Sequence, residues 1–142
     1  MTVYVDTSVV IRRLVGQDEP IDGWGVWDQA YTSVLCRIEF YRTLDRLRLA
    51  GTIDDDDRAK VGDGFEQFWA TCHRVLLSPS VLRRAEEAFS TTVGTLDAIH
   101  LASAIVVDRE ATADIAEFLT HDAQLARAAR AAGYAVRGCD IG

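Results

Sequence analysis

Four acidic residues in this chain stand where a strand end or a helix turn can aim a carboxylate. Asp6 directly follows the strand-like segment 3–5, and Asp122 ends the segment Phe118-Leu119-Thr120-His121-Asp122. Glu39 lies inside a predicted helix, and Asp97 lies in the first turn of another. Carboxylates at equivalent positions of an alternating fold can meet at one point, and hard divalent cations bind such clusters. A metal-dependent phosphodiesterase is the leading hypothesis.

Each acid also has a purely structural interpretation. Asp6 and Asp122 each precede a predicted helix, where Asp is a preferred N-cap residue. Asp97 would meet the positive end of a helix dipole, and Glu39 could form a surface pair with Arg42. Taken together, however, the acids suit the carboxyl edge of a parallel sheet, where ligands of such sheets bind. Crowded carboxylates repel one another, and a divalent cation would neutralise them.

The donor types indicate which cation to expect. Cys36, Cys72 and Cys139 are widely spaced, so they predict neither a zinc site nor a disulfide framework, and a reducing cytoplasm is the expected location. An all-oxygen site suits Mg²⁺ or Mn²⁺. Arg42 and Arg46 lie four residues apart on the helix of Glu39, so they could hold a phosphate backbone, although exposed arginines on a solvated face are equally ordinary.

Composition sets the outer bounds. With 142 residues and 49% hydrophobic content, the chain fits a single domain over residues 1–142. The net charge of −7 argues against a protein that coats nucleic acid by bulk electrostatics, but a nuclease can rely on local arginines and bound cations. The N-terminus does not resemble a signal peptide, and the longest apolar stretch, 99–107, is too short to span a membrane.

Strand-like and helix-like segments alternate along the chain, which predicts a parallel sheet covered by helices on both faces. Strands are expected at residues 3–5, 31–32, 75–77, 117–120 and 134–136. Helices are expected at residues 7–15, 26–30, 33–50, 54–71, 80–89, 95–109 and 123–132, with Thr95 as an N-cap. The acidic run 54–57 is interpreted as a solvated helix start, and His100 as a satisfied histidine beside the core.

At these residues the chain resembles the PIN-domain family, specifically the VapC-type toxin ribonucleases of toxin–antitoxin systems. The matching pieces span nearly the full length, in the family's order: Val5-Asp6-Thr7-Ser8, Ser33 followed by Glu39, Leu96-Asp97-Ala98-Ile99-His100-Leu101-Ala102, and Thr120-His121-Asp122. The resemblance implies a three-layer α/β/α sandwich with a central parallel sheet. It also implies acids clustered around Mg²⁺ or Mn²⁺, RNA cleavage, and inhibition by a small antitoxin.

Carried over by position, Asp6 and Asp97 would be the principal metal ligands. Glu39 and Asp122 would complete the acidic cluster, directly or through water, and Thr120 would support it. The chain departs from the usual pattern at residues 54–80, where no motif is recognised. Gly94 and Thr95 stand where family members often place a basic residue.

Competing functions are less well supported. Receiver domains and haloacid-dehalogenase-type phosphatases also place acids at strand ends, and both families imply an active-site lysine. Here Lys60 is the only lysine and follows the acidic run, and no Asp-x-Asp follows the first strand. A non-cleaving PIN-like scaffold that binds RNA or protein stays open, as does a housekeeping PIN nuclease without an antitoxin.

The acidic pocket also suggests how a partner would bind. An antitoxin arginine could engage two carboxylates through its guanidinium fork and displace a cation. We expect the antitoxin to fold across an apolar groove formed by the helices near residues 7–15 and 33–50. We also expect the protein to form a homodimer.

Overall fold

The computed structural model describes residues 1–16, 19–110 and 112–140, and its centre is a five-stranded sheet. All strand pairs are parallel, in the order β3-β2-β1-β4-β5. The first strand of the chain therefore lies in the middle of the sheet, flanked by the second and the fourth. The strands are β1 (Thr2–Val5), β2 (Gln29–Ser33), β3 (His73–Val75), β4 (Ile115–Leu119) and β5 (Ala135–Arg137).

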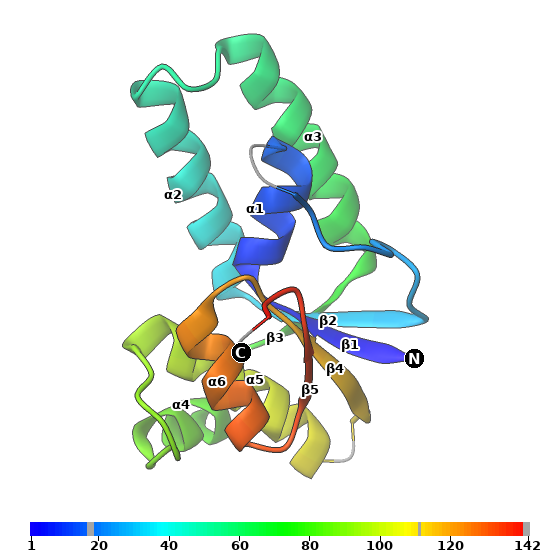
Figure 1. The fold of residues 1–142 in the computed structure, drawn as a ribbon, viewed down its shortest axis with the longest axis vertical. Helices are drawn as coiled ribbons and strands as arrows, with labels where there is room; N and C mark the ends of the chain where they lie inside the picture. The colour runs from blue at the N-terminus through cyan, green and yellow to red at the C-terminus, as the bar shows by residue number, and fades with distance from the viewer. Residues whose placement is uncertain (17–18, 111, 141–142) are drawn as a thin grey trace.

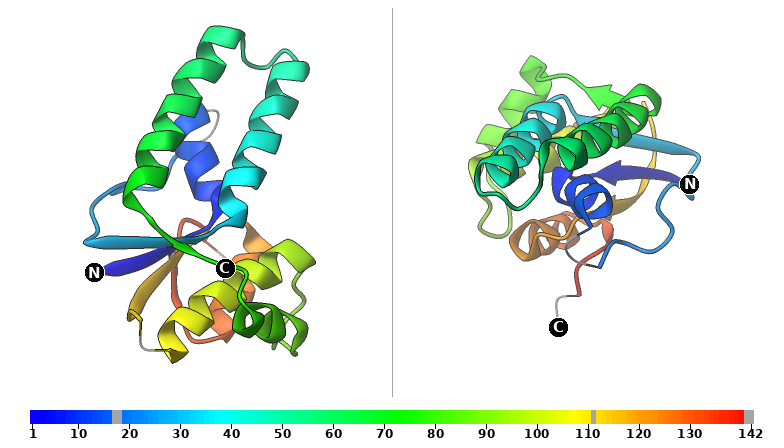
Figure 2. Two further views of the ribbon diagram at one scale, coloured as in Figure 1. Left: turned by 180° about the vertical axis from the view of Figure 1, so that it is seen from behind. Right: turned by 90° about the horizontal axis from the view of Figure 1, so that it is seen from above.

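Helices cover both faces of the sheet (Figure 1). One face carries α1 (Thr7–Val15), α2 (Leu35–Leu49) and α3 (Asp55–Thr71), and the other carries α4 (Pro79–Glu86), α5 (Thr95–Arg109) and α6 (Ala123–Ala131). Helices α2 and α3 extend away from the sheet as an antiparallel pair, as Figure 1 and the left view of Figure 2 show. This arrangement confirms the expected three-layer α/β/α fold.

Alternation along β1 divides the core between the two faces. Val3 and Val5 pack with α1, α2 and α3, whereas Tyr4 packs with α5 and α6 on the other side. All three side chains are fully buried, as expected for the central strand of a doubly covered parallel sheet. Tyr4 additionally stacks on Phe118 of β4, with ring centroids 5.0 Å apart.

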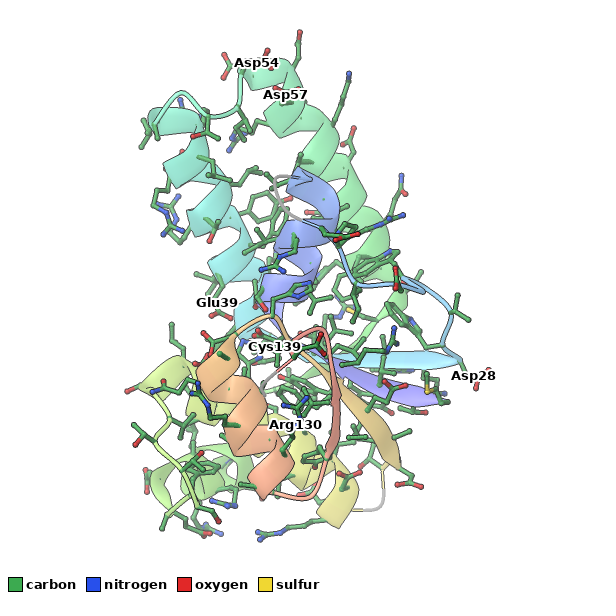
Figure 3. The ribbon with its side chains drawn as sticks, in the orientation of Figure 1. Asp28, Glu39, Asp54, Asp57, Arg130 and Cys139 are labelled. Atoms are coloured by element: carbon green, nitrogen blue, oxygen red, sulfur yellow. The ribbon has the colours of Figure 1, made fainter. Side chains whose placement is uncertain are left out.

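Helix ends largely follow the local signals in the sequence. Helix α1 has the predicted bounds, and Gly51 adopts a positive φ of 74° just beyond α2, where an L side chain would be strained. Helix α3 begins with a capping box, in which the Asp54 side chain accepts from the backbone N–H of Asp57 and Asp57 returns the bond. The acidic run 54–57 is thus a helix start, and Figure 3 shows Asp54 and Asp57 at the far end of the helix pair from Glu39.

Several local predictions were wrong. The helix predicted at residues 80–89 ends at Glu86. No helix forms over residues 26–30, because Gln29 and Ala30 already pair with β1 as the start of β2. The third strand is His73–Val75 rather than 75–77, since pairing with β2 sets its register and leaves Leu76 exposed. Gly94, not Thr95, occupies the N-cap position of α5. At β2 and β3, pairing with the neighbouring strand overrode the local sequence pattern.

None of the helices within the described ranges is long and apolar enough to cross a membrane. That the chain forms a single domain over its full length stays a prediction.

Candidate active site

The site lies at the edge of the sheet where β1 and β4 end. The two strands are neighbours, and the backbone N–H of Asp6 donates to the carbonyl of Leu119 at 2.9 Å. The residues that follow each strand are thereby brought together, namely Asp6 after β1 and Thr120 to Asp122 after β4. This is the edge at which open parallel sheets bind their ligands.

Asp6 is 5% exposed and is held by hydroxyl groups. Its Oδ2 accepts hydrogen bonds from Ser8 at 2.6 Å and from Thr120 at 2.9 Å. Although Asp6 occupies the N-cap position of α1, its side chain makes no capping hydrogen bond to that helix as described. The N-cap interpretation therefore does not account for this carboxylate, which is directed instead toward the end of β4.

Glu39 approaches the same edge from α2, and Figure 3 places it at the end of that helix nearest the sheet. Its Oε1 lies 2.6 Å from Nε2 of His100 and accepts a 2.9 Å hydrogen bond from the Thr7 hydroxyl. Burial acts to raise the pKa of Glu39, but the hydrogen bond and positive charge of His100, together with Thr7, hold that pKa below its usual value. Glu39 is therefore an ionised carboxylate at neutral pH.

His100 joins this group from the second turn of α5 and is completely buried. Its Nδ1 lies 2.8 Å from the Tyr4 hydroxyl, and its Nε2 lies 3.7 Å from Oδ1 of Asp6. Burial acts to lower the pKa of His100, but the hydrogen bond to Glu39 and the nearby negative charges raise it above its usual value. The ring is thus held between acids on one side and a phenol on the other.

Asp97 is partly buried in the first turn of α5. Burial first, and then the charges of Asp6 and Asp122, raise its pKa to about 6. Glu39 contributes in the same direction, whereas His100 opposes it. The charges of the other three predicted acids therefore all act on Asp97, which indicates that the four lie near one another.

Asp122 has a structural role as well. Its Oδ1 caps α6 by accepting from the backbone N–H of Leu125 at 2.8 Å, so the N-cap interpretation is correct for this residue. The backbone N–H of Asp122 in turn donates to the Thr120 hydroxyl at 3.0 Å. The side chain is exposed, so its second oxygen is accessible to solvent at the edge of the cluster.

The cluster has the donor chemistry for a hard cation but is not a closed metal site. In residues 1–16, 19–110 and 112–140, no group of three or more His, Cys, Asp or Glu side chains is already arranged to hold a metal ion. The carboxylate oxygens are nevertheless the ligands that Mg²⁺ and Mn²⁺ prefer. The pKa of Asp97 is raised first by burial and then by neighbouring negative charge, and a bound cation would offset that charge. Metal binding by Asp6, Asp97 and Asp122 stays a prediction.

The two arginines predicted to bind substrate lie on α2 and are exposed. Arg42 reaches Asp45 at 3.4 Å, a long surface ion pair that leaves the guanidinium largely accessible. Contact between Arg42 or Arg46 and a substrate stays a prediction.

Sequence reasoning missed the residues that orient the acids. His100 is a satisfied core histidine, as interpreted, but one of the groups it contacts is Glu39. Tyr4 was not singled out, and Thr7 and Ser8 were named only as part of the matching piece Val5-Asp6-Thr7-Ser8, although all three lie within two residues of Asp6. The available signals were the spacing of three between Asp97 and His100, which places both on one helix face, and the spacing of two between Tyr4 and Asp6 on a strand.

The PIN-domain family profile matches residues 3–131, nearly the whole chain, and the chain belongs to this family. The fold and the cluster of acids at the sheet edge agree with that assignment. Among characterised proteins, the chain is 31% identical over 140 residues to Ribonuclease VapC47 of Mycobacterium tuberculosis (strain CDC 1551 / Oshkosh). The alignment covers 93% of each of the two chains.

Proposed function

We propose that this protein is a metal-dependent endoribonuclease that acts as the toxin of a toxin–antitoxin pair. The observation that carries the proposal is the gathering of acids where β1 and β4 end. Nε2 of His100 lies 2.6 Å from Oε1 of Glu39 and 3.7 Å from Oδ1 of Asp6, and the charges of Asp6 and Asp122 act on Asp97. Carboxylates crowded in this way at a sheet edge are typical of a functional site rather than of a structural ion pair. Similarity to Ribonuclease VapC47 along almost the whole chain supports RNA as the substrate.

Each residue of the site would have a distinct role in catalysis. Asp6, Asp97 and Asp122 would hold Mg²⁺ or Mn²⁺, with Glu39 completing the cluster directly or through water. A divalent cation bound there would supply an activated water and would stabilise negative charge on the phosphoryl oxygens. One of the carboxylates can accept the proton that the water loses. Thr120 and Ser8 fix the orientation of Asp6, since both hydroxyl groups donate to its Oδ2.

The RNA would approach over α2 and the start of α5. Arg42 and Arg46 would bind backbone phosphates, which position a nucleic acid without reading its sequence. The protein carries a net charge of −7, so these local cations matter for attracting a polyanion to an acidic site.

The direct test is incubation of the purified protein with cellular RNA, followed by mapping of the new 5′ ends. We expect cleavage that needs Mg²⁺ or Mn²⁺, stops in EDTA and is absent in Asp97→Asn. A wild-type protein that binds RNA but leaves it intact under these conditions would favour the non-cleaving scaffold instead.

The partner follows from the same chemistry. We propose a small antitoxin that inserts a basic side chain among the acids, where an arginine fork can bind two carboxylates. The antitoxin would dock near α1 and α2, the two helices that bring Ser8 and Glu39 to the site, and the toxin would form a homodimer. Co-expression with a neighbouring small gene should yield a stable complex without nuclease activity. Components that stay separate at micromolar concentration would contradict this part of the proposal.

A further inference from the structure

A chain of hydrogen bonds runs from the buried centre of the sheet to the acidic cluster. The Tyr4 hydroxyl lies 2.8 Å from Nδ1 of His100, and Nε2 of His100 lies 2.6 Å from Oε1 of Glu39. The three residues come from β1, α5 and α2, so the chain links the central strand to helices on both faces of the sheet. Tyr4 and His100 are both completely buried.

The geometry of these contacts fixes the position of the His100 ring. A carboxylate oxygen that lies 2.6 Å from a ring nitrogen accepts a hydrogen bond from it. Nε2 of His100 must therefore carry a proton. Nδ1, on the other edge of the ring, lies 2.8 Å from the Tyr4 hydroxyl. Tyr4 thus fixes the orientation of the ring whose Nε2 donates to Glu39.

Both donors reach the same oxygen of Glu39. His100 contacts Oε1 through Nε2, and the Thr7 hydroxyl donates to Oε1 at 2.9 Å. Neither donor occupies Oε2. A glutamate on a helix has three rotatable side-chain bonds, and fixing one carboxylate oxygen with two donors limits the rotamers that the other oxygen can sample.

We propose that His100 and Tyr4 are positioning residues that hold Glu39 by Oε1, so that its Oε2 is presented to a divalent cation in the acidic cluster. This inference rests on the proposed function for the identity of the cation. It predicts that the hydrogen-bonded chain Tyr4–His100–Glu39 affects metal affinity although Tyr4 and His100 contact neither metal nor RNA. Groups that hydrogen-bond to metal ligands orient those ligands in this way in other proteins.

Two substitutions at His100 separate positioning from packing. In His100→Gln the side-chain amide can reach the place of Nε2 and still donate to Glu39, whereas the shorter His100→Asn retains a polar group only near the place of Nδ1. Isothermal titration with Mn²⁺ should show about tenfold weaker binding for His100→Asn, with most of the affinity recovered in His100→Gln. The Mg²⁺ concentration for half-maximal RNA cleavage should change in parallel, and KM for RNA should not.

Tyr4 offers a matched pair with Tyr134. Both rings pack against Phe118, and the two hydroxyl groups bond side chains of α5, namely His100 and Asp108. Tyr4→Phe should weaken Mn²⁺ binding about fivefold, the loss expected for one neutral hydrogen bond. Tyr134→Phe should leave Mn²⁺ affinity unchanged, even if it lowers the melting temperature as much as Tyr4→Phe does.

The outcomes discriminate clearly. Folded His100→Asn and Tyr4→Phe proteins that bind Mn²⁺ as tightly as wild type would overturn the positioning role, even if the wild type cleaves RNA. Equal weakening in His100→Gln and His100→Asn would also overturn it, because only His100→Gln keeps a donor at the place of Nε2. If the variants weaken Mn²⁺ binding as expected but the wild type does not cleave RNA, the proposed function is wrong and the positioning role of His100 and Tyr4 still holds.

Discussion

The side-chain hydroxyl of Thr120 donates a 2.9 Å hydrogen bond to Oδ2 of Asp6, although 114 positions separate the two residues in the chain. The same hydroxyl accepts from the backbone N–H of Asp122 at 3.0 Å, and Thr120 is completely buried. One side chain thereby connects the end of β1 to the start of α6. The contact exists because β1 and β4 pair in parallel and end together.

This contact can be tested by removing only the hydroxyl. Thr120→Val keeps the shape of the side chain but leaves Asp6 with one donor fewer, so we expect the free energy of unfolding to fall by about 1–2 kcal/mol. RNA cleavage should fall as well, because Asp6 is less firmly oriented. Thr120→Ser retains the hydroxyl and is the control. Urea denaturation measures the stability of each variant, and initial rates measure its RNA cleavage. If Thr120→Val is as active as Thr120→Ser, the Thr120 hydroxyl does not orient Asp6 for cleavage.

The raised pKa of Asp97 predicts a pH-dependent stability in metal-free protein. Its pKa moves from an ordinary value of 3.8 to about 6, so the folded state binds this proton more tightly than the unfolded chain does. The resulting stability is fully present below about pH 4 and is lost as the pH rises through about 6. In Asp97→Asn this loss is absent.

The measurement is the difference in unfolding free energy between Asp97→Asn and wild type in EDTA. Relative to wild type, the variant should gain about 1 kcal/mol between pH 4 and pH 7, after allowing for solvent screening of a half-buried carboxyl. Saturating Mg²⁺ should reduce this gain, because a bound cation favours the ionised carboxylate. A difference that stays constant with pH would show that the folded structure does not raise the pKa of Asp97.

Asp122 combines capping with its place in the cluster, and two substitutions separate these roles. Asp122→Asn keeps an oxygen that can accept from Leu125, so the stability of α6 should change little. Asp122→Ala loses the cap and should cost about 1 kcal/mol in thermal or urea unfolding. Both should impair RNA cleavage, because both remove the charge. If Asp122→Asn cleaves at the wild-type rate, Asp122 is only a cap.

The arginines of α2 should affect RNA binding more than the chemical step. Arg42→Ala and Arg46→Ala should each raise KM about threefold to tenfold and reduce the salt dependence of binding, as expected for phosphate contacts. Arg109→Ala serves as the control, because Arg109 lies at the opposite end of α5 from Asp97. Steady-state cleavage at two salt concentrations distinguishes these outcomes. Equal effects of all three changes would indicate a non-specific loss of positive charge.

Most of the fold could be predicted because its signals are local, whereas the role of the four acids stays a prediction. The bounds of α1 follow from Asp6 before it and Gly16 after it, and β1 is recognisable as a short apolar segment before an acid. The edges of the sheet could not be predicted in the same way. Strand β3 has three residues, and its register depends on pairing with β2 rather than on its own composition.

The orienting groups of the site lie beyond such local reasoning. His100 is linked to Tyr4, 96 positions away, and to Glu39, 61 positions away. The local sequence around a buried histidine does not reveal whether its hydrogen-bond partner is a backbone carbonyl or an acid of the site. The partner is decided by how β1, α2 and α5 pack, which a single sequence does not specify.

The most direct test of the central claim compares wild type with Asp6→Asn in RNA cleavage at neutral pH with Mg²⁺. The substitution keeps the shape of a side chain that is 5% exposed and can still accept from Thr120 and Ser8, so the melting temperature should hold or rise as repulsion among the acids is relieved. The account predicts that wild type cleaves RNA and that the variant is at least about a hundredfold slower, equivalent to about 2.7 kcal/mol in the barrier. Equal cleavage by the two folded proteins would contradict it.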